Sequence, residues 1–175
     1  MSASPSVDLP RPSWPTVRLP PKTVSASPPG RLRGFAWADF DGEGVPDAAL
    51  LDDQGVLRVF LNLRGSEFRE RPVPSQFPRV AAIAAAEITG DGIFDVLGIA
   101  ADGTLTRLSQ QANGSTFEAV QLTRAEVPSG LSPDNARLLV ADLDNNGAGD
   151  LVISGMTTSR SLLGVDGRSF RPLSV

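Results

Sequence analysis

Three nine-residue acidic segments recur along this chain, and this repetition constrains the fold more than any other feature of the sequence. The segments span residues 39–47, 87–95 and 142–150, and they hold ten of the twenty acidic residues of the 175-residue chain. Each segment has oxygen-bearing side chains at positions 1, 3, 5 and 9 and a glycine at position 6. An apolar run precedes and follows each segment, so we expect each to be a loop between two strands.

A second motif repeats in step with the acidic segments. Gly-x-x-Phe occurs at residues 65–68, 114–117 and 167–170. Successive acidic segments begin 48 and 55 residues apart, and the successive phenylalanines lie 49 and 53 residues apart. The chain therefore contains three internal repeats with insertions of a few residues between them.

Each repeat divides into four short strands. In the first repeat, the predicted strands are residues 32–38, 47–51, 56–61 and 67–71. Four antiparallel strands repeated about every 50 residues are the sequence signature of β-propeller blades. The predicted fold class is therefore all-β and of the β-propeller type, with three four-stranded antiparallel blades that form a partial propeller.

The chain is expected to fall into an arm and three blades. Residues 1–30 hold eight of the fifteen prolines and six serines, which is typical of a linker or extended arm. The alternative is that this arm adds an edge strand to a blade. Blade 1 is assigned to residues 31–79, blade 2 to residues 80–123, and a linker with blade 3 to residues 124–175.

Three blades do not close a ring, because closed propellers typically have four to eight. The first and last blades would each present an apolar face to water. We therefore expect closure either by further blades of a longer chain or by self-association, for example of two copies.

The acidic segments have the composition of calcium loops. Calcium takes six to eight oxygen ligands, which side chains at positions 1, 3, 5 and 9 and a carbonyl at position 7 would supply. Glycine at position 6 permits the sharp bend, since a positive φ costs it little. An EF-hand is rejected because its ligating Glu at position 12 is replaced by Leu50, Gly98 and Ile153. The alternative is that these are acidic turns held by Asx-type hydrogen bonds without a metal.

The three repeats resemble the FG-GAP/VCBS repeats of integrin α-chain propellers and of bacterial exported proteins, including the ASPIC/UnbV group. The resemblance rests on the acidic loops and Gly-x-x-Phe motifs and covers residues 31–175. It implies a calcium ion in each loop and an extracellular or periplasmic location, although no signal peptide follows Met1. The implied ligands are the side chains of Asp39, Asp41, Glu43, Asp47, Glu87, Thr89, Asp91, Asp95, Asp142, Asp144, Asn146 and Asp150, with the carbonyls of Val45, Ile93 and Ala148.

Two of the loops depart from the family pattern D-x-D-x-D-G-x-x-D. Glu43 is one methylene longer than the usual Asp or Asn, and the second loop combines Glu87 with the neutral Thr89. Because ligand charge helps set calcium affinity, we expect the third loop to bind best, the first nearly as well and the second least.

Composition excludes several function classes. The chain has no His, Cys or Tyr, which removes His-based acid/base pairs, thiol nucleophiles, disulfides and Cys/His zinc sites. Its formal net charge of −4 disfavours nucleic acid, and no apolar run is long enough for a membrane span. Phe35 and Trp37 alternate with small residues on a predicted inner strand, and we expect them to pack in the core.

The expected function is a non-enzymatic protein-interaction or adhesion scaffold in which calcium is structural. This step is an analogy from the fold, since propellers serve many functions. The alternative is an accessory or carbohydrate-binding domain of a larger exported enzyme. Catalysis would then lie elsewhere or on acids such as Asp102 and Asp166, and glycan binding between blades would require an exposed Trp37.

Overall fold

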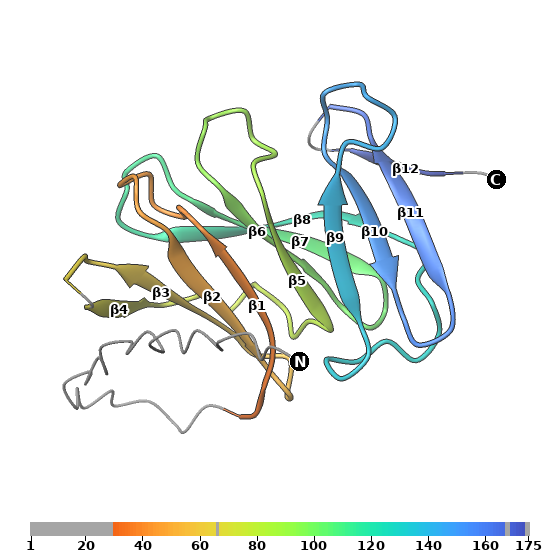
Figure 1. The fold of residues 1–175 in the computed structure, drawn as a ribbon, viewed down its shortest axis with the longest axis horizontal. Coiled ribbons are helices and arrows are strands. Elements are labelled where there is room, and N and C mark those ends of the chain that lie inside the picture. The colour runs from red at the N-terminus through yellow and green to blue at the C-terminus, as the bar shows by residue number, and fades with distance from the viewer. Residues whose placement is uncertain (1–29, 66, 167–168, 174–175) are drawn as a thin grey trace, which may run out of the picture.

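The computed structural model describes residues 30–65, 67–166 and 169–173, and this part of the chain contains strands and no helix (Figure 1). The predicted all-β class is confirmed. Among these residues there is accordingly no helix with the length and apolar character to cross a membrane. The predicted arm, apart from Gly30, lies outside the described residues.

Each repeat forms one four-stranded antiparallel sheet, and in every sheet the strands lie side by side in chain order. The first sheet contains β1 (Leu32–Ala38), β2 (Asp47–Asp52), β3 (Leu57–Asn62) and β4 (Phe68–Arg71). The second contains β5 (Ala82–Ala86), β6 (Asp95–Ile99), β7 (Thr104–Gln110) and β8 (Phe117–Arg124). The third contains β9 (Arg137–Ala141), β10 (Asp150–Ser154), β11 (Ser159–Gly164) and β12 (Phe170–Pro172). The strands predicted for the first repeat are correct to within one residue at each end.

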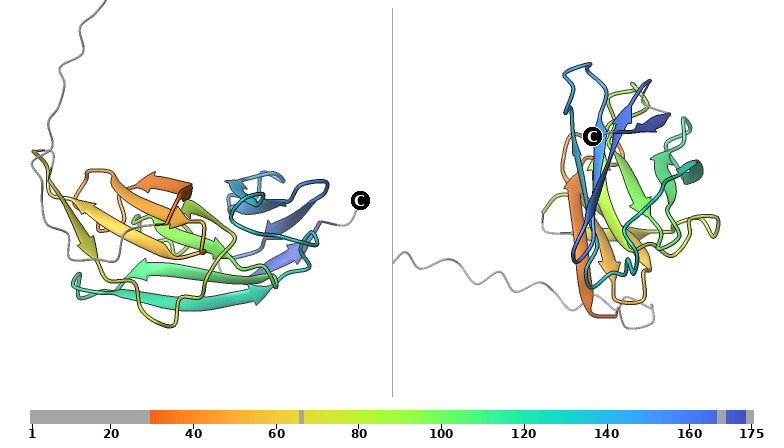
Figure 2. Two further views of the ribbon diagram at one scale, coloured as in Figure 1. Left: turned by 90° about the horizontal axis from the view of Figure 1, so that it is seen from below. Right: turned by 90° about the vertical axis from the view of Figure 1, so that its right-hand side faces the viewer.

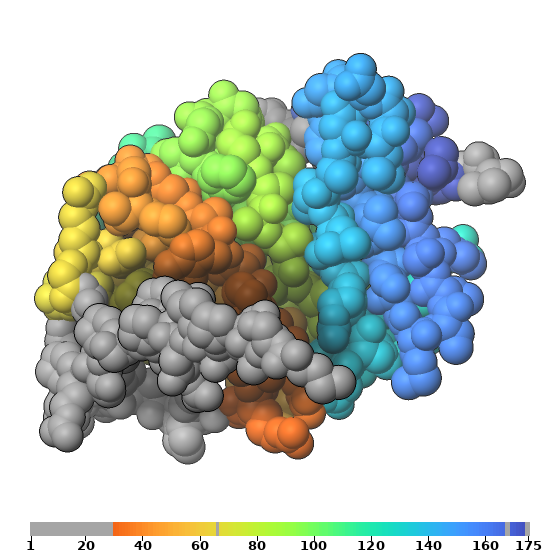
Figure 3. Space-filling model, viewed as in Figure 1, coloured from red at the N-terminus to blue at the C-terminus, as the bar shows by residue number. Residues whose placement is uncertain are grey.

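The first strands of the three sheets lie next to one another. β1 contacts β5 and β5 contacts β9, and these strands follow one another across the molecule in the ribbon and space-filling views (Figures 1 and 3). The last strand of the second sheet, β8, lies on the opposite side from β1 and β9 (Figure 2). The arrangement resembles consecutive propeller blades, but the sheets do not close into a ring.

Two hydrophobic cores hold the sheets together. One lies between the first and second sheets, and it includes Leu51 and Val59 on one side and Val96 and Leu108 on the other. The other lies between the second and third sheets, and it includes Leu97, Ile99, Leu151 and Ile153. The second sheet is therefore covered on both faces, and every residue of β6 is buried. β3 instead alternates between buried and half-buried residues, as expected for a strand with one covered face.

The prediction that Phe35 and Trp37 pack in the core is wrong. Their residues are 69% and 53% exposed, because they lie on the face of β1 that points away from the second sheet. Ala36 and Ala38, on the other face of the same strand, fill the core between the first two sheets. The Trp37 ring instead contacts Phe68 of β4, with ring centroids 5.9 Å apart. The side chains of β1 alternate as the sequence predicts, but the buried face carries the small residues and the exposed face carries the large ones.

Candidate metal centres

The three acidic loops lie at the same edge of the molecule, each between the first and second strands of its sheet (Figure 1). Their backbones have a left-handed residue at the same position. The glycine at position 6 has a positive φ in every loop, at 77° for Gly44, 82° for Gly92 and 85° for Gly147. Because this left-handed region is cheap only for glycine, the repeated glycine is explained by the turn itself.

The first loop brings three carboxylates together. Oxygens of Asp39, Asp41 and Asp47 lie within 4.8 Å of one another. Asp39 is held in place by the backbone N–H groups of Gly42 and Gly44, each donating at 2.8 Å. These bonds orient the carboxylate at position 1 toward the centre of the loop.

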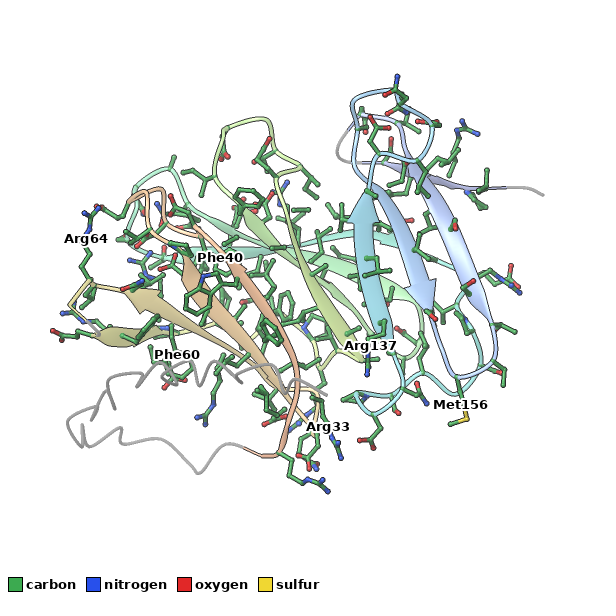
Figure 4. All side chains as sticks on the ribbon, viewed as in Figure 1. Arg33, Phe40, Phe60, Arg64, Arg137 and Met156 are labelled. Atoms are coloured by element: carbon green, nitrogen blue, oxygen red, sulfur yellow. The ribbon has the colours of Figure 1, made fainter. Side chains whose placement is uncertain are left out.

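Asp47, at position 9, is fully buried at the start of β2. Its two carboxylate oxygens accept hydrogen bonds from the backbone N–H of Phe40 at 2.8 Å and of Asn62 at 2.7 Å. Phe40 packs beneath the loop with 1% of its surface exposed (Figure 4). Asp47 therefore connects the start of the loop to the end of β3 through hydrogen bonds that need no cation.

Glu43 and Val45 lie at the exposed side of the same loop. Glu43 is outside the three-carboxylate group, and its carbonyl accepts a hydrogen bond from Arg64 Nη2 at 3.1 Å. Arg64 reaches it from the turn between β3 and β4 (Figure 4). Val45 lines a hollow of about 470 Å³ together with Asp41 and Glu43.

The third loop repeats the geometry of the first. Oxygens of Asp142, Asp144 and Asp150 lie within 4.8 Å of one another. Asp142 accepts from the backbone N–H of Asn146 at 3.0 Å and of Gly147 at 2.9 Å. Asp150 is fully buried, like Asp47.

The remaining ligands predicted for the third loop are engaged with the backbone. Asn146 Oδ1 accepts from Ala148 N at 2.7 Å, and Asn146 Nδ2 donates to the carbonyl of Gly164 at 3.0 Å. Asn146 therefore ties the loop to the end of β11. Ala148 itself is half-buried.

The second loop does not bring its acids together in the same way. In the described part of the chain, Glu87, Asp91 and Asp95 form no group of converging carboxylates. Glu87 accepts from Gly90 N at 2.6 Å and from the Thr89 hydroxyl at 3.4 Å. Asp91 accepts from the N–H of Ile93 at 2.9 Å. The side chains at positions 1, 3 and 5 are thus bonded within local turns.

Burial shapes the ionisation of these acids. Burial raises the pKa of Asp47 and Asp95 above the ordinary Asp value, and it raises that of Asp41, to which the Asp39 charge also contributes. Burial opposes ionisation of Asp150 as well, but the N–H groups of Gly164, Leu143 and Asp144 together lower its pKa.

The donor sets differ in how well they fit a hard divalent cation. The first and third loops each offer three convergent carboxylates, which is the oxygen-rich chemistry that Ca²⁺ prefers. The second loop also has carboxylate oxygens, but they do not converge on one point. The first and third loops are therefore the candidate metal centres.

The sequence pattern does not reveal several hydrogen-bond donors around the first loop. Gln110 Nε2, from the end of β7, donates to the carbonyl of Asp41 at 2.8 Å, and Phe94 N donates to the carbonyl of Asp39 at 3.1 Å. Arg71 Nη1 donates in turn to Gln110 Oε1 at 3.1 Å. These bonds connect the first loop to the second sheet, across a sequence separation that no local pattern reveals.

Asp102 and Asp166, the two acids considered for catalysis, lie in hairpin turns of different sheets. Asp102 accepts from Thr104 N at 3.0 Å and forms an exposed ion pair with Arg124, and these interactions lower its pKa. Asp166 accepts from the backbone N–H and the hydroxyl of Ser169, each at 2.7 Å. Both acids have the hydrogen bonds of turn-stabilising residues.

Comparison of the chain with protein-family models gave no match, and neither did comparison with curated protein sequences. The assignment of function therefore depends on the fold and on the geometry of the loops.

Proposed function

We propose that this protein is a calcium-binding module of the β-propeller type that serves as a scaffold for protein interaction or adhesion. The observation that carries the proposal is the convergence of three carboxylates in the first loop and again in the third, at the same positions of the repeat. Two independent loops with one donor geometry favour a shared ligand over chance clustering of surface acids.

The role proposed for calcium is structural. Each loop joins the first and second strands of a sheet, and its position-9 acid is buried at the start of the second strand. A bound divalent cation would relieve the repulsion among the three carboxylates and hold the two strands together. The extracellular or periplasmic location implied by the family resemblance is part of the same proposal.

Calcium titration after treatment with a chelator tests the proposal. Calorimetry is expected to detect binding, and calcium at 100 times its Kd is expected to raise Tm by about 5–10 °C, since saturation of one site contributes about 2.7 kcal/mol. Asp144→Ala is the matched variant, because it removes one of the three carboxylates of the third loop. Absence of both heat and thermal shift in the unaltered protein would refute the proposal.

A second candidate function is carbohydrate binding as an accessory domain of a larger exported enzyme. One observation favours it: Trp37 is 53% exposed and packs beside the Phe68 ring, so an aromatic surface is open to a ligand. The same surface is also the uncovered face of the first sheet. Glycan-array binding that is lost in Trp37→Ala would favour the carbohydrate-binding role, and absence of binding would favour the scaffold.

A further inference from the structure

The face of the second sheet that points toward the third carries two buried polar residues where the first sheet has apolar ones. Arg107 and Ser109 of β7 are only 8% and 4% exposed. The strand pairing places Arg107 opposite Leu97, just as Val59 of β3 lies opposite Ala49 in the first sheet. An arginine thus occupies the position that a core valine occupies one repeat earlier.

The same register brings these residues beside the second acidic loop. Continuing the β6–β7 pairing by one residue places Ser109 directly opposite Asp95, the acid at position 9. The corresponding continuation in the first sheet places Leu61 opposite Asp47. Arg107 is then the diagonal neighbour of Asp95 on the same face, within reach of a long side chain.

The contacts of Arg107 leave part of its charge available to the loop. Its Nη2 pairs with Glu118 Oε1 at 3.4 Å, and the Glu118 side chain is 44% exposed to water. Its buried Nε has no hydrogen-bond partner. Arg107 also lines a hollow of about 760 Å³ together with Thr89 and Asp91 of the second loop.

Asp95 is buried between these neighbours and the backbone of its own loop. The backbone N–H of Ile88 donates to Asp95 Oδ2 at 3.2 Å. The buried Ser109 hydroxyl, on the residue opposite Asp95, has no hydrogen-bond partner among the described residues. Arg107 therefore supplies a buried positive charge beside the second loop, which is the electrostatic role that a metal ion would have in a calcium loop.

We propose that Arg107 is the built-in counter-charge of the second loop, so that this loop keeps its conformation without a metal and the protein binds two calcium ions, at the first and third loops. This inference rests on the proposed calcium-binding function. It accounts together for the buried arginine between two sheets and for the failure of Glu87, Asp91 and Asp95 to converge. A buried positive charge beside the loop also repels a divalent cation, whereas Arg171, which pairs with Asp144 of the third loop at 3.8 Å, is exposed and screened by water.

The number of ions bound per chain provides the first test. Calorimetric titration of the chelator-treated protein with Ca²⁺ is expected to give two ions per chain, and Asp95→Asn is expected to leave this number unchanged. The double variant Asp41→Asn/Asp144→Asn is expected to lose all binding. Three ions in the unaltered protein, or one ion remaining in the double variant, would overturn the inference while leaving calcium binding intact. No binding at all would instead refute the proposed function.

A double-mutant cycle in chelator provides the second test, because it reads the interaction between Arg107 and Asp95 directly. Arg107→Leu is expected to lower Tm by about 5–10 °C, since it removes the positive charge beside the buried Asp95 and leaves that carboxylate with the Ile88 N–H. In the Asp95→Asn background the same change is expected to cost at most half as much. Equal losses in the two backgrounds, or no loss in either, would contradict the counter-charge role.

Arg124→Leu is the matched control for the cycle. Arg124 lies in β8 of the same sheet, and its ion pair with Asp102 is largely exposed, with side chains 65% and 52% accessible. Its loss is expected to change Tm by less than about 2 °C, because exposed ion pairs contribute little. Should Arg107→Leu not fold, recovery of folding by added Asp95→Asn would support the inference, and the ion count would still decide it.

Discussion

At the scale of single residues, the acids of one loop differ in their structural roles. The acid at position 9 is buried and accepts backbone N–H bonds, whereas the acids at positions 1 and 3 remain partly or fully accessible to a ligand. Asp150 shows the first role most clearly, with bonds from the N–H groups of Leu143 and Gly164. Its removal should therefore harm the fold even when no metal is present.

We predict that Asp150→Ala lowers the free energy of unfolding by about 2–4 kcal/mol in chelator, because it leaves the buried N–H of Gly164 and the part-buried N–H of Leu143 without an acceptor, at about 1–3 kcal/mol each. Asp144→Ala is expected to change stability by less than about 1 kcal/mol under the same conditions, since the ion pair of Asp144 with Arg171 is long, at 3.8 Å, and open to water. Urea denaturation followed by circular dichroism measures both. Equal effects of the two variants on the free energy of unfolding would contradict this difference in structural role.

At the scale of elements, the hairpin turns are shaped by what packs against them. Gly103, in the turn between β6 and β7, has a φ of 87°, and a Cβ added there would lie 2.0 Å from the carbonyl oxygen of Ala125. The chain after β8 is bound to this turn, because Ala125 N donates to the carbonyl of Gly103 at 2.8 Å. The turn therefore anchors the connection between the second and third sheets.

Gly103→Ala is predicted to destabilise the protein by about 3 kcal/mol or more, because it combines an unfavourable φ with a clash against backbone. Gly130→Ala is the control, since Gly130 also has a positive φ, of 73°, but a Cβ there meets nothing within 4 Å. That variant is expected to cost about 1 kcal/mol. Thermal unfolding compares the two, and similar losses would show that backbone strain alone accounts for the effect.

At the scale of the whole molecule, the sheets at the two ends of the row each leave one face uncovered by another sheet in the described part of the chain. On the first sheet this face carries Phe35, Trp37 and Phe68, all of them exposed. On the third sheet it includes Leu139, which is 60% exposed. Exposed apolar side chains on such uncovered faces favour association, either with further blades or with a second copy.

We predict that this chain self-associates when isolated, and that Phe35→Asp shifts it toward monomer by placing a charge in the contact. Sedimentation equilibrium over a range of protein concentrations measures the association. Met156→Asp is the control, because Met156 is 82% exposed in the turn between β10 and β11, away from that surface (Figure 4). A stable monomer at all concentrations would exclude closure by self-association.

The sequence by itself determined the local structure. The spacing of acids, glycines and apolar runs was enough to place the three loops between strands and to divide the first repeat into four strands, because turn conformation and strand alternation depend on neighbouring residues. The order of calcium affinity, with the second loop last because of Glu87 and Thr89, stays a prediction from side-chain length and charge.

Only the tertiary structure decided what depends on which faces meet. The face of β1 that is covered by the second sheet carries alanines, so Phe35 and Trp37 are exposed although a strand pattern alone favours burying them. The position of Arg107 beside Asp95 likewise follows from the register of β6 and β7, and the bond from Gln110 to the first loop follows from the packing of two sheets. Contacts between residues distant in the chain are set by packing, which local sequence patterns do not encode.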